Sequence, residues 1–303
     1  MVHIYNTWKA EHNKLYATSE EHDYRFKVFQ DTYKYIVKSN ENPKHTFELG
    51  LNEFSDLTSA EFVKKYTGLG SQKDLESVEK KYADLSGVVA ASEVDWVNSN
   101  DLASPVKSQG YCGSCWAFAT VASLEFLYKR ETGNEDLFAE QQLVDCDTSN
   151  WGCSGGWPHN ALYYTMVNGI APGAKYPYTG TDDQCKYDNN WSVFTPYTYK
   201  WVAGYDGAAL KAAVNESVIV VTLFADPIQS YKRGIFNGAC NGTNDHAVTM
   251  VGYGSEDGQD YWRIRNSWGS WWGEKGYFRL ARSDDKGDGQ CGINEYGVYP
   301  VSS

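Results

Sequence analysis

The most constraining feature of the sequence is the stretch Gln109–Ala119, QGYCGSCWAFA, where two cysteines three positions apart precede a tryptophan and an apolar run. Cys112 and Cys115 could be metal ligands, could form a redox pair, or could have different roles from each other. Zinc would require a second close pair of cysteines or histidines, which the sequence lacks, and so no metal is expected. A redox pair usually follows a strand at the start of a βαβ unit, and that pattern is also missing.

The number of cysteines indicates three disulfides and one free thiol, because the chain has 7 cysteines and all of them follow residue 111. Three N-glycosylation sequons begin at Asn190, Asn215 and Asn241. Both features favour a lysosomal or secreted protein. The polar N-terminus has no apolar signal core, so either the chain is cytosolic or a signal peptide has been removed.

Composition indicates a packed globular protein, since 42% of the 303 residues are hydrophobic and 15% are aromatic. Residues 1–91 hold 12 Lys/Arg and 14 Asp/Glu, net −2, which leaves 15 and 25, net −10, for residues 92–303. No basic face is visible, so we expect no nucleic-acid partner. The longest strongly apolar run, Val218–Ala225, is too short to cross a membrane, so no membrane partner is expected either.

The chain changes character near residue 70. Apolar spacing predicts helix over residues 5–40, with Thr18 or Ser19 as a cap, and alternation predicts an extended stretch over residues 46–56. Residues 70–93 are charged or small, and we call them the linker; we expect it to be exposed and open to proteolysis.

From Asp95 onward, helical patterns precede strand patterns. Helices are predicted at 115–128, 140–145 and 158–168. Short β-branched or aromatic segments separated by glycine then follow: SVIVVTLFA, HAVTMVGYG, YWRIRNSW and GYFRLAR. This order predicts an α+β protein of two lobes with a cleft between them.

Cys115 opens a predicted helix, where the helix dipole favours a thiolate and lowers the pKa. A thiolate needs a base. His246 lies at the start of a strand pattern, which would hold the ring rigidly, whereas His159 is expected to be exposed at a helix start. Asn266 follows another strand and could accept the ring N–H of His246. Gln109 could direct its amide N–H to the same place as the backbone N–H of Cys115, forming an oxyanion hole. Taken singly, each could equally be a structural histidine, a turn asparagine or a loop glutamine.

Four blocks in register resemble the papain-like cysteine proteases and cover about residues 95–303: QGYCGSCWAFA, CSGGWP, DHAVTMVGYG and NSWGSWWGEKGYFRL. The resemblance implies a helical lobe and a β-barrel-like lobe. It implies these roles: Cys115 as nucleophile, His246 as base and then acid, Asn266 as orienting group, and Gln109 as oxyanion donor. Ser108 stands where the family commonly has Asn before Gln-Gly. No insertion suggests an occluding loop, so we expect an endopeptidase.

The same resemblance implies the disulfide pairs, which six cysteines alone leave open among 15 combinations. Carried over, the pairs are Cys112–Cys153, Cys146–Cys185 and Cys240–Cys291, which leaves Cys115 free.

The first third of the chain resembles the propeptide of the cathepsin L-like branch. Two motifs carry the resemblance: Glu21, Arg25, Phe29, Ile36 and Asn40, then Gly50, Asn52, Phe54 and Asp56. Thr32 stands where the first motif usually has Asn. The chain is therefore expected to be a proenzyme, with an inhibitory propeptide over residues 1–90 and a peptidase domain over 91–303. The propeptide would run through the cleft against the substrate direction.

Substrate contacts are also implied by the resemblance. Gly155 and Gly156 would pair with the substrate backbone. The pocket for the residue two before the scissile bond (P2) and its surroundings would be formed by Trp157, Pro158, Val221, Asp245, Ala247, Trp268 and Tyr296. This pocket favours apolar side chains, although Tyr296 could shorten it and Glu295 could turn inward to accept Arg.

The expected partners are protein and peptide substrates, the chain's own propeptide and cystatin-like inhibitors, and the enzyme is expected to be a monomer without cofactor. Activation is expected at acidic pH, as carboxylates are protonated. A non-catalytic binding protein and an amide-ligating enzyme on the same scaffold remain alternatives.

Overall fold

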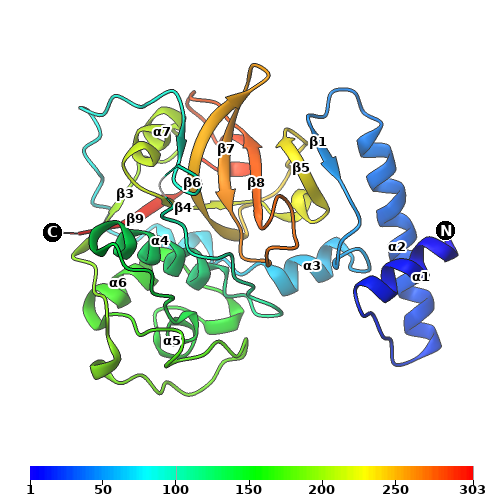
Figure 1. Ribbon diagram of the computed structural model, residues 1–303, viewed down its shortest axis with the longest axis horizontal. Helices are drawn as coiled ribbons and strands as arrows, with labels where there is room; N and C mark the ends of the chain where they lie inside the picture. The colour runs from blue at the N-terminus through cyan, green and yellow to red at the C-terminus, as the bar shows by residue number, and fades with distance from the viewer. Residues whose placement is uncertain (100, 303) are drawn as a thin grey trace.

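The computed structural model describes residues 1–99 and 101–302. A helical N-terminal part lies at one side of the molecule, a sheet occupies the centre, and a group of helices packs below the sheet (Figure 1). The helices are α1 (Val2–Glu11), α2 (Ser19–Asn40), α3 (Ser59–Tyr66), α4 (Cys115–Thr132), α5 (Glu140–Cys146), α6 (Pro158–Asn168) and α7 (Gly207–Glu216). The strands are β1 (Phe47–Leu49), β2 (Val94–Asp95), β3 (Thr198–Trp201), β4 (Ile219–Leu223), β5 (Tyr231–Phe236), β6 (His246–Glu256), β7 (Gln259–Arg265), β8 (Tyr277–Ala281) and β9 (Gly297–Val301).

The predicted helical stretch at residues 5–40 is two helices, because α1 ends at Glu11 and Asn13 adopts a positive φ of 51°. Thr18 then caps α2 by accepting a hydrogen bond from the backbone N–H of Glu21. The two helices are joined through an aromatic cluster of Tyr5, Trp8 and Phe29. They form one unit beside the sheet (Figure 1).

The second propeptide motif is held by the first. Asn40 donates to and accepts from the backbone of Leu49, both at 2.9 Å. Arg25 donates to the carbonyl oxygen of Asp56 at 3.0 Å and to Glu61 at 2.9 Å. The carboxylate of Asp56 is 3% exposed and pairs with Lys14 at 3.0 Å. These contacts fix the turn that leads into α3, whose start carries a capping box of Thr58 and Glu61.

Within the described residues, nine strands form one sheet with the order β1-β5-β8-β7-β6-β4-β9-β3, and β2 pairs with β6. The path does not return on itself, so the sheet is open and the lobe is not a closed barrel. The mixed α+β architecture is confirmed, whereas the barrel-like closure of the strand lobe is not found among the described residues. The propeptide strand β1 extends the sheet by antiparallel pairing with β5.

The central helix α4 is buried along most of its length because it packs against β6 on one side and against α5 and α6 on the other. Its first residue, Cys115, therefore lies where the helical lobe meets the sheet. The disulfides are Cys112–Cys153, Cys146–Cys185 and Cys240–Cys291. Cys115 is the free cysteine, as the resemblance implied. No helix among residues 1–99 and 101–302 has the length and apolarity of a membrane span.

Candidate active site

Three side chains from three elements meet at the lobe interface. Cys115 is the first residue of α4 and His246 the first residue of β6, and both are 0% exposed. The sulfur of Cys115 accepts the backbone N–H of Ala247 at 3.4 Å, which places the thiol beside the start of β6. Asn266 directly follows β7, and its Oδ1 lies 2.8 Å from Nε2 of His246.

The histidine ring is held on a second side by an indole. Trp268 stacks on His246, with ring centroids 4.8 Å apart and planes 26° apart. The backbone N–H of Ser267 donates to Oδ1 of Asn266 at 2.8 Å, so this oxygen is fixed in position. The contact with Asn266 leaves Nδ1 of His246 as the ring nitrogen without a partner among the described residues. A base with one nitrogen oriented and the other free is what general acid–base catalysis requires.

Gln109 lies next to Cys115, but its amide is occupied. Its Oε1 accepts the hydroxyl of Ser267 at 2.6 Å. Its Nε2 donates to the carbonyl oxygen of Cys112 at 2.9 Å and to that of Tyr66, a propeptide residue, at 3.3 Å. The N–H group that the sequence assigned to an oxyanion therefore faces a propeptide carbonyl in this structure.

The propeptide crosses the site in extended form after α3. The carbonyl oxygen of Tyr66 accepts the indole N–H of Trp268 at 3.0 Å, and the N–H of Gly68 approaches the sulfur of Cys115. The backbone N–H groups of Gly68 and Leu69 both donate to the carbonyl oxygen of Asp245 at 3.1 Å. The chain thus passes from Trp268, over the thiol, toward the glycines of the helical lobe.

Gly156 holds the propeptide backbone on that side. Its N–H donates to Gly68 at 3.1 Å, its carbonyl accepts from Gly70 at 3.0 Å, and the Leu69–Gly156 pairing is parallel. A side chain at Gly155 would crowd this contact, since an added Cβ would lie 3.2 Å from the carbonyl oxygen of Gly68. Gly156 therefore pairs with the propeptide backbone, and Gly155 leaves room for it; their pairing with a substrate stays a prediction.

Burial in the zymogen favours the uncharged forms of Cys115 and His246, whereas the sequence predicted a lowered cysteine pKa. Burial raises the pKa of the Cys115 thiol to about 12, and Asp245 adds to the increase. The N–H groups of Ala247, Trp116 and Gly68 act in the opposite direction but do not compensate. Burial also lowers the pKa of His246 to about 4. The lowering of the cysteine pKa by the helix dipole does not offset the increase that results from the loss of water around the sulfur.

The region predicted to hold the P2 side chain lies beside Trp157, and propeptide residues occupy part of it. A cavity of about 210 Å³ is lined there by Gln72, Leu75, Glu76, Lys80, Trp157, Tyr205, Thr222, Glu295 and Tyr296. Trp157 is 0% exposed and donates its indole N–H to the carbonyl oxygen of Ser71 at 3.2 Å. Pro158 is the first residue of α6. Glu295 and Tyr296 both line the cavity, so neither of the two considered possibilities for its floor is removed.

Val221 is a correction to the expected pocket. Its side chain lies in the core of the strand lobe, and the next residue of β4, Thr222, lines the cavity. Successive residues of a strand point to opposite faces, so a shift of one residue in aligning β4 moves the assignment to the wrong face. His159 is also not exposed: it is 3% exposed, and its backbone N–H donates to the hydroxyl of Tyr296 at 3.0 Å.

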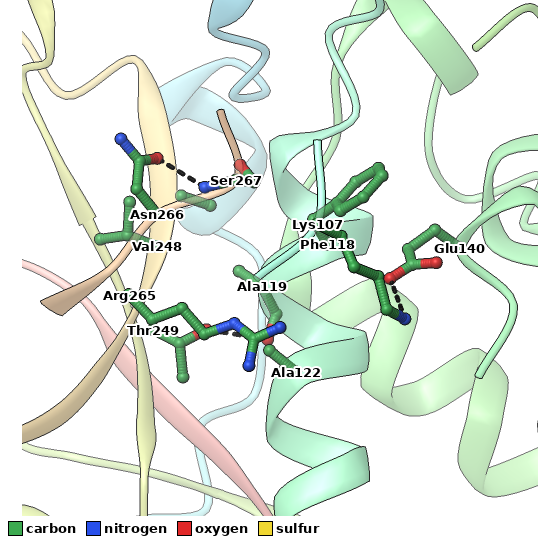
Figure 2. Close-up of a pocket in the computed structure, with 11 residues that line it drawn as sticks. Lys107, Phe118, Ala119, Ala122, Glu140, Val248, Thr249, Arg265, Asn266 and Ser267 are labelled. Carbon is green, nitrogen blue, oxygen red and sulfur yellow. Dashed lines mark hydrogen bonds and ion pairs between the residues drawn. The ribbon is translucent and has the colours of Figure 1, made fainter. Parts of the chain in front are cut away.

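A second, enclosed cavity lies behind Asn266 and is too small for a substrate group, at about 10 Å³. Figure 2 shows it between α4 and the strands, with Lys107 reaching Glu140 on the far side. Lys107 also pairs with Glu125 at 2.6 Å, so two buried carboxylates share one ammonium group. The cavity therefore has no room for a substrate group, and the propeptide lies over the thiol of Cys115.

Comparison with known proteins agrees with this arrangement. The family model described as papain family cysteine protease matches residues 90–301, and the cathepsin propeptide inhibitor domain matches residues 5–62. The chain belongs to the papain family of cysteine proteases. Papaya proteinase 4 from Carica papaya is 39% identical over 307 residues, which cover 100% of this chain and 88% of the relative.

Solved proforms have the same overall fold. A recombinant stem bromelain precursor matches with a TM-score of 0.91 and 34% identity, covering 100% of this chain and 99% of its own. The digestive procathepsin L2 proteinase from Tenebrio molitor larval midgut matches with a TM-score of 0.91 and 33% identity over 99% of both chains. This papain-family protease is therefore a zymogen whose propeptide is an inhibitor domain.

Two contributors were not singled out from the sequence, and a third acts through a different group from the one expected. Ser267 holds the side chains of Gln109 and, through its backbone, Asn266. Thr222 lines the cavity beside Trp157. Asp245 was expected as a substrate contact, but it acts here through its backbone carbonyl, which no residue type reveals. Aligning β4 with the family one residue further along the chain would have identified Thr222.

Proposed function

We propose that this zymogen is an endopeptidase that hydrolyses peptide bonds through a Cys115 thioester. The thiolate of Cys115 attacks the carbonyl carbon, and the oxyanion takes hydrogen bonds from Gln109 and the backbone N–H of Cys115. His246 protonates the leaving amine and then activates the water that releases the acyl group. The observation that carries the proposal is the approach of Cys115 to the start of β6, where His246 is oriented by Asn266.

For substrate selection, we propose that the cleft holds the P2 side chain of the substrate beside Trp157. The indole and the Cβ of Ala247 favour apolar atoms near the backbone. A lysosomal or secreted location, a monomeric enzyme and inhibition by cystatin-like proteins are further parts of this proposal. They are supported by the three disulfides and by the open cleft that removal of the propeptide would leave.

Acid activation is proposed from two ion pairs that hold the propeptide together and to the peptidase. Although burial acts against it, hydrogen bonds from Thr58 and the guanidinium of Arg25 keep the pKa of Glu61 below its usual value. Lys232 and Arg233 lower the pKa of Glu48 in the same way, across the β1–β5 contact. A lowered carboxyl pKa gives stability that is present above the ordinary value, near 4.5, and is lost as the pH falls through the folded-state pKa.

Active-site labelling tests the proposal. A peptide carrying a thiol-reactive epoxide is offered to the zymogen at neutral pH and again after acid treatment, and the labelled residue is located by mass spectrometry. Labelling of Cys115 only after treatment, together with peptide hydrolysis that Cys115→Ala abolishes, is expected. Wild-type rates of hydrolysis in the separated Cys115→Ala enzyme would contradict the mechanism.

A further inference from the structure

Two anchors bound a short stretch near the end of the linker. On the upstream side, Tyr82 pairs with Trp201, and the N–H of Ala83 donates to the Trp201 carbonyl oxygen at 2.8 Å. On the downstream side, the N–H of Ala91 donates to Oδ1 of Asn215 at 3.0 Å. The hydroxyl of Tyr253 donates to the carbonyl oxygen of Ala91, also at 3.0 Å. The chain is therefore fixed at Ala83 and again at Ala91.

Residues 86–90, between the anchors, are held weakly, whereas Leu85 packs against the core of the strand lobe. In the part of the chain that the structure describes, their hydrogen bonds are local, from Ser86 to Asp84 and from Val88 to Leu85. Val89 is 91% exposed, although it is a large apolar residue. A Cβ added at Gly87 would meet nothing within 4 Å. A segment with these properties can leave the surface and enter a protease cleft once Ala91 releases its two hydrogen bonds.

We infer that the propeptide is removed by hydrolysis of the peptide bond between Ala90 and Ala91. This rests on the proposed preference for an apolar residue two before the scissile bond, which Val89 supplies for that bond. Among the other large apolar residues of the linker, Leu75 and Val78 pack against the core of the helical lobe, and Leu85 packs against that of the strand lobe. Tyr82 is held by its pairing with Trp201, and Val88 is only half-buried, so Val89 is the most exposed valine of the segment. Water adds its hydroxyl to the Ala90 carbonyl carbon, and the Ala91 nitrogen leaves with the remaining proton.

The cut is made by a second enzyme molecule. Tyr253, which holds Ala91, lies seven residues along β6 from His246, or roughly 23 Å at the rise of an extended strand. The zymogen's own thiol is in addition covered by Gly68. The rate of cutting in the folded zymogen therefore depends on the concentration of enzyme that is already active.

The contact between Ala91 and Asn215 has a further role in the mature enzyme that the cut produces. After the cut, the nitrogen of Ala91 is an ammonium group at acidic and neutral pH, and Oδ1 of Asn215 is already in place to accept from it. A hydrogen bond with a charged donor is stronger than the amide contact it replaces. Asn215 therefore holds the new N-terminus of the mature enzyme.

The test uses full-length Cys115→Ala zymogen as substrate and a small amount of active wild-type enzyme, with N-terminal sequencing and intact mass as readouts. A mature fragment beginning at Ala91 is expected, at an initial rate proportional to the enzyme added. Val89→Asp is expected to slow this cut at least tenfold, because a carboxylate enters the apolar position. Val88→Asp is the matched control and should leave the cut at Ala91.

A fragment beginning at another residue, a rate independent of added enzyme, or a stronger effect of Val88→Asp than of Val89→Asp would each overturn the inference. A further experiment distinguishes failure of this inference from failure of the proposed function. A serine protease that cuts after small apolar residues is added to the zymogen as an independent probe of the segment. If it nicks the segment while the wild-type chain hydrolyses no peptide, the proposed function fails. If the wild-type chain hydrolyses peptides but cuts its propeptide elsewhere, the inference alone fails.

Substitution of Asn215 tests the product contact. Asn215→Ala is expected to lower the Tm of the mature enzyme by about 3 °C and that of the zymogen by less. Asn215→Asp keeps an acceptor for the ammonium group and should retain most of the stability. Equal losses in the zymogen and the mature enzyme, or equal losses for the two substitutions, would contradict the role of Asn215.

Discussion

Two consecutive parts of the propeptide meet the peptidase in different ways. The anchor segment, residues 47–66, buries apolar side chains at the strand lobe, with Phe54 and Phe62 both 0% exposed and edge-on to Trp268. The linker has no buried residue in its single helical turn, Gln72–Leu75, and Val89 lies in solvent. Between the two, Gly68 covers the thiol.

Because of this difference, one part of the propeptide is suited to inhibiting the enzyme and the other to being cut when the propeptide is removed. Buried aromatic area supplies most of the affinity of such a contact, so the anchor segment should decide how tightly the propeptide is held. Residues 86–90 at the end of the linker make no such apolar contact and are therefore free to supply the bond that is cut. A propeptide bound tightly along its whole length would block the cleft equally well but would offer no accessible site for its removal.

The largest expected effect is in the anchor segment. Phe62→Ala removes a fully buried ring, and such a change costs about 3–5 kcal/mol. The inhibition constant of the separated propeptide on the active enzyme should rise by about 10²–10³-fold, since each 1.4 kcal/mol is a factor of ten. Leu75→Ala in the linker is the comparison, and a rise as large as that for Phe62→Ala would remove the distinction between the two parts.

The crossing point itself is sensitive to volume. A Cβ at Gly68 would lie 2.0 Å from the carbonyl oxygen of Gly113, so Gly68→Ala must lift the propeptide from the thiol. Overpacking of this kind costs about 1–3 kcal/mol, and labelling of Cys115 in the zymogen at neutral pH should accelerate about 10–100-fold. Gly87→Ala adds the same methyl group where nothing lies within 4 Å and should leave the labelling rate unchanged. Similar rates for the two variants would show that Gly68 does not cover the thiol.

A smaller effect is expected from the ion pair behind the anchor segment. Glu61→Gln removes the charge that pairs with Arg25 at 2.9 Å but keeps an acceptor for the capping box. Because such partly exposed pairs contribute about 0.2–1 kcal/mol, propeptide affinity at pH 7 should fall by up to about fivefold. Below the folded-state pKa of Glu61, wild type and variant should coincide, so the pH profile of activation should shift upward. Identical profiles of initial rate against pH would remove Glu61 from the account.

Glu53 should act in the opposite direction, with an effect of similar or smaller size. Burial, with a contribution from Asp56, raises the pKa of Glu53 to about 7. A raised carboxyl pKa gives stability that is complete below the ordinary value of 4.5 and is lost as the pH rises toward 7. Glu53→Gln should therefore tighten the propeptide at neutral pH and leave it unchanged at pH 4. Weaker binding at pH 7, measured as a higher inhibition constant, would contradict this sign.

The sequence was sufficient for the elements that carry local signals. The apolar run after Cys115 predicted α4, and Pro158 with the following pattern predicted α6 at its observed bounds. The resemblance brought together Cys115, His246 and Asn266, which come from three elements. The strands β3 and β9, at one end of the sheet, were not predicted, because short strands with tyrosines and a proline have no clear alternation.

Other properties depend on tertiary contacts that no single position reveals. Val221 was assigned in place of Thr222 because the alignment of β4 with the family was shifted by one residue. Such a shift moves a side chain to the opposite face of the strand. The lowered pKa expected for Cys115 considered the helix alone and omitted the propeptide backbone that excludes water. The first error concerns the face of the strand on which a residue lies, and the second concerns what covers the residue.

The central claim is that the propeptide keeps Cys115 uncharged and that its departure allows the thiolate to form beside His246. The most direct measurement is the rate of Cys115 alkylation against pH, in the zymogen and after propeptide removal, with Cys115→Ala as the blank. We predict that the zymogen thiol becomes reactive only well above pH 9, in line with its pKa of about 12, whereas the mature enzyme is alkylated rapidly below pH 7. The same profile in both forms would contradict the account.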